Sequence, residues 1–145
     1  MSLLLNARDQ KALSTALLSK GLRSTKQRAS VYCSILDKQD HPTADDILIR
    51  VRKKLPSISL ATVYNCLETL VDCGLVRQVN LDRASTRFCP NLAPHAHFKC
   101  IETGKIFDLS IDEESFNSLQ SILPQGFKAQ NFELSFSGSV NHSLN

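Results

Sequence analysis

A change in hydrophobic period near residue 75 constrains this chain more than any other feature of its sequence. Before that point apolar residues recur at helical spacing in four segments, and after it they alternate with other residue types, as in strands. Helices and strands that follow one another in separate runs are typical of the α+β class. The sequence therefore predicts a helical N-terminal part followed by a part that contains a sheet.

The four predicted helices are delimited by residues that favour helix ends. The first spans residues 7–20 and ends at Gly21. Thr25 is a suitable N-cap for the second, which extends to about Lys38. This pattern leaves a short turn at His41-Pro42 before the third helix.

The third and fourth predicted helices carry clear apolar stripes. Thr43 and Asp46 have the spacing of a capping box, and the helix that they open ends before Pro56. Ser59 can cap the fourth helix, which ends near Gly74. Its polar side carries Thr62, Tyr64 and Asn65 among others.

Alternation around Asp82-Arg83 predicts a β-hairpin with strands near residues 75–79 and 85–87. The order helix, turn, helix, hairpin is typical of a winged-helix domain, in which the second helix of the motif enters the major groove of DNA. We predict such a DNA-binding domain over residues 1–89.

The remainder, residues 90–145, is predicted to be a second, small α/β domain. Its expected elements are strands at His95–Cys100, Lys105–Leu109 and Phe127–Phe136, and a helix capped by Ser110 with Glu113 that extends to Leu123. Three strands leave an exposed sheet edge, which favours pairing with a second chain.

The two parts differ in charge. Residues 1–89 contain 14 Lys and Arg against 8 Asp and Glu, whereas residues 90–145 contain 3 against 6. A basic half beside an acidic half favours a nucleic-acid partner for the basic one.

Composition also bounds the compartment. No apolar run approaches the roughly 18 residues of a membrane span, and Leu3-Leu4-Leu5 is too short for a signal peptide. The five cysteines are irregularly spaced, so we expect free thiols in a reducing compartment, with Cys33, Cys66 and Cys73 buried in helices. These features predict a cytoplasmic protein with no membrane partner.

A group of metal-ligand residues begins at Cys89 and continues with His95, His97 and Asp108. In a strand, His95 and His97 project from the same face. One thiolate, two imidazoles and one further oxygen or nitrogen complete the tetrahedral shell that zinc prefers.

Several motifs together resemble the ferric uptake regulator family over about residues 10–138. They are Gly21-Leu-Arg-Ser-Thr-Lys-Gln-Arg28, His41-Pro-Thr-Ala-Asp-Asp-Ile47, Ser59-Leu-Ala-Thr-Val-Tyr64, Thr86-Arg-Phe88, His95-Ala-His97 and Gly104-Lys-Ile-Phe-Asp108. The resemblance implies a dimeric, metal-responsive transcription factor with an N-terminal winged helix and a C-terminal dimerisation domain.

The resemblance also implies a regulatory metal site made of His41, Cys89, His95, His97 and Asp108. Position 89 is Asp or Glu in many iron and peroxide sensors of the family, whereas Cys there is similar to the zinc uptake regulators. We therefore expect one Zn²⁺ per chain, with Fe²⁺ or Mn²⁺ as the alternative. Whether His41 or Asp108 completes the shell stays open.

A second, structural zinc of the family is not expected. Relatives commonly hold it with two Cys-x-x-Cys pairs, but here the first pair reads Cys100-Ile-Glu-Thr103 and the second Val140-Asn-His-Ser143. One thiolate of four is too few for a site whose binding supplies about 10–16 kcal/mol of folding energy.

Double-stranded operator DNA is the expected partner of the N-terminal domain, and the chain is expected to form a homodimer. Tyr64 and Asn65 are predicted to reach base edges, Thr62 a phosphate, and Arg23 resembles a family residue that enters the minor groove. The remaining predicted phosphate contacts are Lys26, Arg28, Arg77 and Arg87.

The sequence is also compatible with three functions other than zinc-responsive repression. One is an iron, manganese or peroxide sensor of the same fold, and another is a redox switch that uses Cys89 and Cys100. The third, a metal-dependent hydrolase, is disfavoured because the sequence has no His-Glu-x-x-His motif and no glycine-rich phosphate loop. We expect no enzymatic activity and no small-molecule substrate.

Overall fold

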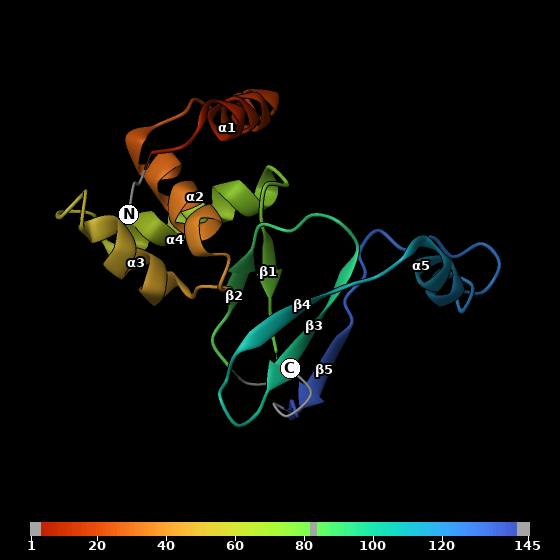
Figure 1. Cartoon of the computed structure of the whole chain (residues 1–145). Helices are drawn as coiled ribbons and strands as arrows, with labels where there is room; N and C mark the ends of the chain where they lie inside the picture. Colours follow the sequence, from red (N-terminus) through yellow and green to blue (C-terminus); the bar gives the residue numbers. More distant parts are fainter. Residues whose placement is uncertain (1–3, 82–83, 142–145) are drawn as a thin grey trace. The chain divides into compact units, whose positions relative to one another are not determined.

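The computed structural model of the protein describes residues 4–81 and 84–141, and the chain divides into two compact units, Met1–Leu92 and Ala93–Asn145 (Figure 1). The predicted hairpin turn at Asp82-Arg83 lies outside the described residues, as do His142 and Ser143 of the segment where relatives have their second cysteine pair. Within those ranges, no helix combines the length and hydropathy needed to cross a membrane.

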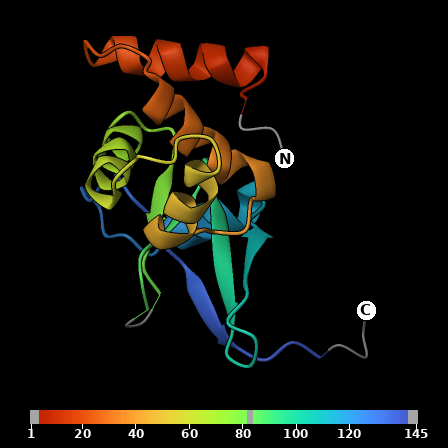
Figure 2. The same ribbon diagram turned by 90° about the vertical axis from the view of Figure 1, so that its left-hand side faces the viewer.

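The first unit contains four helices and a two-stranded hairpin. In chain order these are α1 (Ala7–Ser19), α2 (Lys26–Lys38), α3 (Ala44–Arg52), α4 (Leu60–Asp72), β1 (Arg77–Val79) and β2 (Arg87–Cys89). Helices α2, α3 and α4 contact one another, and α1 lies across one end of α2 (Figure 2). This confirms the α+β class and the predicted winged-helix order.

The predicted N-caps of α2, α3 and α4 are present. The Thr25 hydroxyl accepts a hydrogen bond from the N–H of Arg28 at 3.2 Å, and Thr43 and Asp46 form a capping box. The Ser59 hydroxyl accepts from the N–H of Thr62 at 3.1 Å. These local contacts satisfy backbone donors that have no partner inside a helix, which explains why sequence alone located the helix starts.

The end of the third helix was predicted too late. Helix α3 stops at Arg52, because the N–H of Lys53 bonds to the carbonyl of Arg50 and the chain tightens into a turn. Leu55 still faces the core from this turn, so the apolar stripe continued beyond the helix itself.

The core of the first unit is built from one face of each helix. Its largest fully buried side chains are Leu13, Leu17, Ile35, Ile47, Leu67 and Leu70. The predicted burial of the helical cysteines is confirmed for Cys33 and Cys66, while Cys73 is half-buried. The opposite face of α4 stays exposed and carries Tyr64 and Asn65.

The second unit is a three-stranded sheet with one short helix. Its elements are β3 (His95–Cys100), β4 (Ile106–Ser110), α5 (Glu113–Gln120) and β5 (Ser135–Gly138), and the strand order is β4-β3-β5. Strand β3 is antiparallel to β4 and parallel to β5, and in the β3–β4 register His97 faces Asp108. The figures show β3 as the central strand (Figures 1 and 2).

Three predictions for this unit were wrong. The N-cap of α5 is Asp112, whose carboxylate accepts from the N–H of Ser115 at 2.7 Å, because Ser110 is paired with His95 as the last residue of β4. The helix also ends at Gln120 rather than Leu123. The last strand covers Ser135–Gly138 rather than 127–136, because pairing with β3 begins at Ser135.

Candidate metal centre

His41 lies in the connection between α2 and α3, held against strand β2. The N–H of Phe88 donates to the Pro42 carbonyl at 3.0 Å, and Thr43 forms a β-bridge with Arg87. The backbone of His41 is left-handed, with φ of 54°, and only 3% of the residue is exposed. Such a conformation in a non-glycine residue costs about 1–3 kcal/mol and is often found at functional sites. His41 is therefore not part of a solvated turn.

Cys89 is the last residue of β2 and is fully buried. Because residues 41–43 run beside β2, the sulfur of Cys89 lies next to the ring of His41. Their ligand atoms lie within 4.8 Å of each other. The first unit thus presents one thiol and one imidazole together, as a pair of candidate ligands.

The second unit brings three further candidate ligands together. The Nε2 atoms of His95 and His97 are 3.0 Å apart, and Asp108 Oδ1 lies 3.2 Å from Nε2 of His97 and 3.6 Å from Nε2 of His95. The cause is local: His95 and His97 project from one face of β3, and Asp108 lies opposite His97 on β4. The three predicted ligands of this unit therefore converge on one point.

The size of this triangle fits a metal ion. Zinc–ligand bonds of about 2.0–2.1 Å place neighbouring ligands of a tetrahedron about 3.3–3.4 Å apart. An octahedral shell with similar bonds has edges of about 3.0 Å. The observed separations of 3.0, 3.2 and 3.6 Å span both values, so His95, His97 and Asp108 match one face of either shell.

A backbone carbonyl orients one of these imidazoles. Nδ1 of His95 lies 2.7 Å from the carbonyl oxygen of Ala93, and because a carbonyl only accepts, Nδ1 must carry the proton. In the neutral imidazole this tautomer leaves the lone pair on Nε2, which faces His97 and Asp108. Partners of this kind hold metal-bound histidines in the right tautomer. Sequence reasoning missed this contact because a carbonyl has no side-chain signature.

Cys100, the last residue of β3, is 1% exposed and occupies the position of the absent zinc pair. The hydroxyl and N–H of Thr103, and the N–H groups of Glu102 and Val140, donate to its sulfur and lower the pKa of the thiol. Hydrogen-bond donors therefore surround the one retained sulfur. In the described residues no second cysteine of the second unit accompanies it, so this position does not fit a structural zinc.

The predicted DNA-contacting residues all belong to the first unit, but they differ in exposure. Tyr64 is 53% exposed. Asn65, Arg23, Lys26 and Arg77 are exposed as well, and Thr62, Arg28 and Arg87 are half-buried.

Three of the predicted arginines donate to backbone carbonyls. Arg28 Nη1 lies 2.8 Å from the carbonyl oxygen of Arg23, and Arg77 Nη2 lies 3.4 Å from that of Leu92. Arg87 Nη1 lies 3.0 Å from the carbonyl oxygen of His41. These side chains help to hold loops, a role that sequence analysis did not assign to them.

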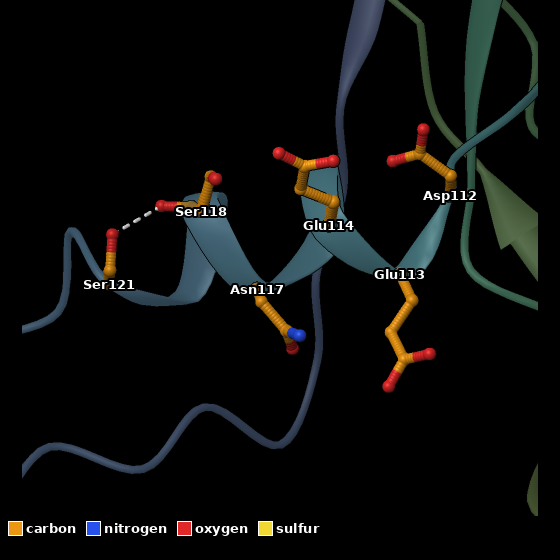
Figure 3. Close-up of a pocket in the computed structure, with 6 residues that line it drawn as sticks. All are labelled: Asp112, Glu113, Glu114, Asn117, Ser118 and Ser121. Carbon is orange, nitrogen blue, oxygen red and sulfur yellow. Dashed lines mark hydrogen bonds between the residues drawn. The ribbon is translucent and has the colours of Figure 1, made fainter.

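A pocket along α5 gathers acidic and hydroxyl side chains (Figure 3). It is lined by Asp112, Glu113, Glu114, Asn117, Ser118 and Ser121. Figure 3 shows Glu113 pointing to the opposite side of the helix from Glu114, while Asp112 caps the helix through the N–H of Ser115. The hydrogen bonds from Ser115 lower the pKa of Asp112. Glu113 thus does not converge with Glu114, and the residues of this pocket are not among the described groups whose ligand atoms lie close enough together to hold a metal ion.

The sequence is similar to a known protein family and to characterised members of other organisms. Residues 19–137 match the Ferric uptake regulator family. The peroxide-responsive repressor PerR of Staphylococcus epidermidis is 38% identical over 93 residues, which make up 64% of this chain and 62% of that protein. The chain thus matches less than two thirds of that repressor's length.

Solved structures extend the similarity over nearly the whole chain. The ferric uptake regulator Fur of Helicobacter pylori is similar with a TM-score of 0.77, covering 100% of this chain and 98% of that chain at 18% identity. The peroxide stress regulator of Campylobacter jejuni has a TM-score of 0.69, covering 94% of this chain and 98% of that chain at 29% identity. Both carry the same fold.

Proposed function

Because this chain belongs to the ferric uptake regulator family, we propose that it is a metal-responsive transcriptional repressor that senses zinc and binds double-stranded operator DNA. A repressor must reach DNA, so its proposed place is the cytoplasm. The observation that carries the metal part is the triangle of His95, His97 and Asp108, with edges of 3.0, 3.2 and 3.6 Å.

We propose that a single regulatory site takes ligands from both units. Cys89 and His41 lie side by side in the first unit, and the second unit supplies His95, His97 and Asp108. Only five residues, 90–94, separate Cys89 from His95 in sequence, so a short linker connects the candidate ligands of the first unit to those of the second. A bound divalent cation supplies the attraction that holds such ligands together.

Zinc is the proposed metal because Cys89 offers a thiolate. Soft sulfur ligands favour zinc, whereas oxygen-rich sites favour manganese or ferrous iron. The sulfur is fully buried, which protects it from solvent oxidants. The same burial of Cys89 and Cys100 argues against the alternative in which these two thiols form a redox switch.

The proposed DNA interface is the exposed face of α4, which is the second helix of the winged-helix motif. Tyr64 and Asn65 are exposed there, and Thr62 lies at its N-terminus. Helix N-termini attract phosphate, and exposed side chains on such a helix read base edges in the major groove. The basic first unit supplies further phosphate contacts.

Metal binding is proposed to control DNA affinity through geometry. Ligands contributed by two units, once bound together, restrict the angle between them. In a homodimer this angle sets the separation of the two α4 helices, so metal binding shifts the population toward a form that matches both half-sites.

A peroxide-sensing regulator that uses iron or manganese is the second candidate. It is favoured by the 38% identity to the Staphylococcus epidermidis repressor, which is described as peroxide-responsive. In that case oxidation of His41 or His95 beside bound iron would be the signal. Mass spectrometry after aerobic exposure of the iron-loaded protein would show oxygen added to one of these histidines.

Elemental analysis combined with DNA binding tests the leading proposal. We expect one zinc per chain and operator binding that a chelator abolishes and added zinc restores. DNA affinity should also fall steeply with salt, because phosphate neutralisation releases counterions. Chelator-resistant DNA binding would refute metal control, and protein that takes up iron but ignores zinc would support the second candidate.

A further inference from the structure

Strand β2 has partners on both of its edges. Strand β1 pairs with one edge, with Arg77 opposite Cys89. On the other edge the N–H of Phe88 donates to the Pro42 carbonyl, and Arg87 forms a β-bridge with Thr43. The connection between α2 and α3 is therefore fastened to the hairpin, directly beside the two candidate ligands of the first unit.

The backbone of His41 is strained, so contacts from neighbouring residues must stabilise its conformation. Its φ of 54° is unfavourable for a side chain with a Cβ, and the proline that follows restricts it further. Arg87 Nη1 donates to the His41 carbonyl at 3.0 Å, across 46 residues of sequence. A planar guanidinium is a rigid donor that suits this role.

We propose that Arg87 is a positioning residue of the metal site, whose guanidinium holds the His41 backbone so that the imidazole stays beside the Cys89 thiol. The inference rests on the proposed metal site and adds a residue to it. It also reassigns a side chain that the sequence predicts to contact phosphate.

Charge and positioning predict opposite effects of removing Arg87 on metal affinity. Arg87 is two residues from Cys89 on the same strand, and a cation near a dication weakens metal binding. If charge were all that mattered, Arg87→Ala would strengthen metal binding. Loss of a positioning contact weakens it instead, typically by about 10–100-fold for partners behind metal ligands.

Cobalt(II) is a suitable probe because a cobalt–thiolate bond gives a charge-transfer absorption that reports Cys89 directly. Competition titration of the full chain against a chelator is expected to show about 10–100-fold weaker cobalt binding in Arg87→Ala, with a weaker thiolate band. Arg87→Met, which keeps the aliphatic stem, should show the same loss and decides the matter if the alanine variant does not fold. Arg87→Lys should recover part of the affinity.

Lys38→Ala is the control, since Lys38 is an exposed side chain three residues before His41 and its loss also removes one positive charge. Its cobalt affinity should be unchanged or higher. If Arg87→Ala and Arg87→Met bind cobalt with wild-type affinity, Arg87 has no positioning role. If these variants also bind DNA more weakly, Arg87 contacts a DNA phosphate, as the sequence predicts. Failure of the wild-type protein to bind cobalt would refute the metal site itself, and the inference with it.

Discussion

A sulfur atom at residue 89 distinguishes the proposed site from one built of nitrogen and oxygen alone. We expect Cys89→Asp to lower zinc affinity more than tenfold while manganese affinity stays level or rises, because carboxylate oxygen suits the harder ion. Competition titrations with both metals measure the ratio. Cys73→Ser, at a half-buried thiol after α4, is the control, and an unchanged zinc-to-manganese ratio in Cys89→Asp would contradict the assignment.

Cys100 is a buried cysteine whose sulfur accepts several hydrogen bonds. Donors from Thr103, Glu102 and Val140 lower the pKa of its thiol, so the folded protein favours the thiolate more than the unfolded chain does. A group with a lowered pKa adds stability above its unfolded pKa, about 8.5 for a thiol, and loses it as pH falls through the folded pKa.

Thr103→Val should therefore lower the free energy of unfolding mainly at alkaline pH. The hydroxyl of Thr103 makes the largest contribution to the lowered pKa of Cys100, so its removal raises that pKa. We expect the difference in unfolding free energy between wild type and variant to be larger above the ordinary thiol pKa than below it. Denaturant titrations on both sides measure this, with Thr15→Val on the exposed face of α1 as control. A pH-independent difference would argue against the thiolate.

Helix α4 has two faces that can be separated experimentally. Leu67 is 1% exposed in the core, so Leu67→Ala should cost about 2–5 kcal/mol of unfolding free energy. Tyr64 is 53% exposed, so Tyr64→Ala should leave thermal stability nearly unchanged while it weakens operator binding. Leu18→Ala, on the exposed side of α1, is the control for both measurements. Unchanged operator affinity in Tyr64→Ala would remove it from the interface.

At the level of elements, the helices were predictable where short-range contacts define them. Thr25, Ser59 and the Thr43–Asp46 box act within three residues of the helix start, so their effect is visible in sequence. Strand β5 was not predictable, since only its pairing with β3 decides where it begins. For the same reason Ser110 joined β4 and left the N-cap of α5 to Asp112.

On the scale of the whole molecule, the second unit leaves much apolar surface uncovered. Its helix α5 has no buried residue, and Ile101, Ile122, Phe127 and Phe136 are between 49% and 76% exposed. A unit of this size gains stability by burying such surface against a second copy. This supports the proposed homodimer through residues 93–141.

We expect Phe136→Glu, on the β5 edge of the sheet, to shift the protein from dimer to monomer. A buried charge without a partner opposes association, whereas the same change at Leu18 of α1 should leave the dimer intact. Sedimentation velocity distinguishes the two states. A dimer that persists in Phe136→Glu would exclude this edge from the interface.

The sequence by itself determined the order of helices and strands, the N-caps of α2, α3 and α4, and the identity of the candidate ligands, because these depend on residue type and short-range spacing. The tertiary structure alone decided which of those residues meet. His41 and Arg87 are 46 residues apart, and only the packing of the α2–α3 connection against β2 joins them. Convergence of His95, His97 and Asp108 likewise required the β3–β4 register, since a slip of one residue turns a side chain to the other face.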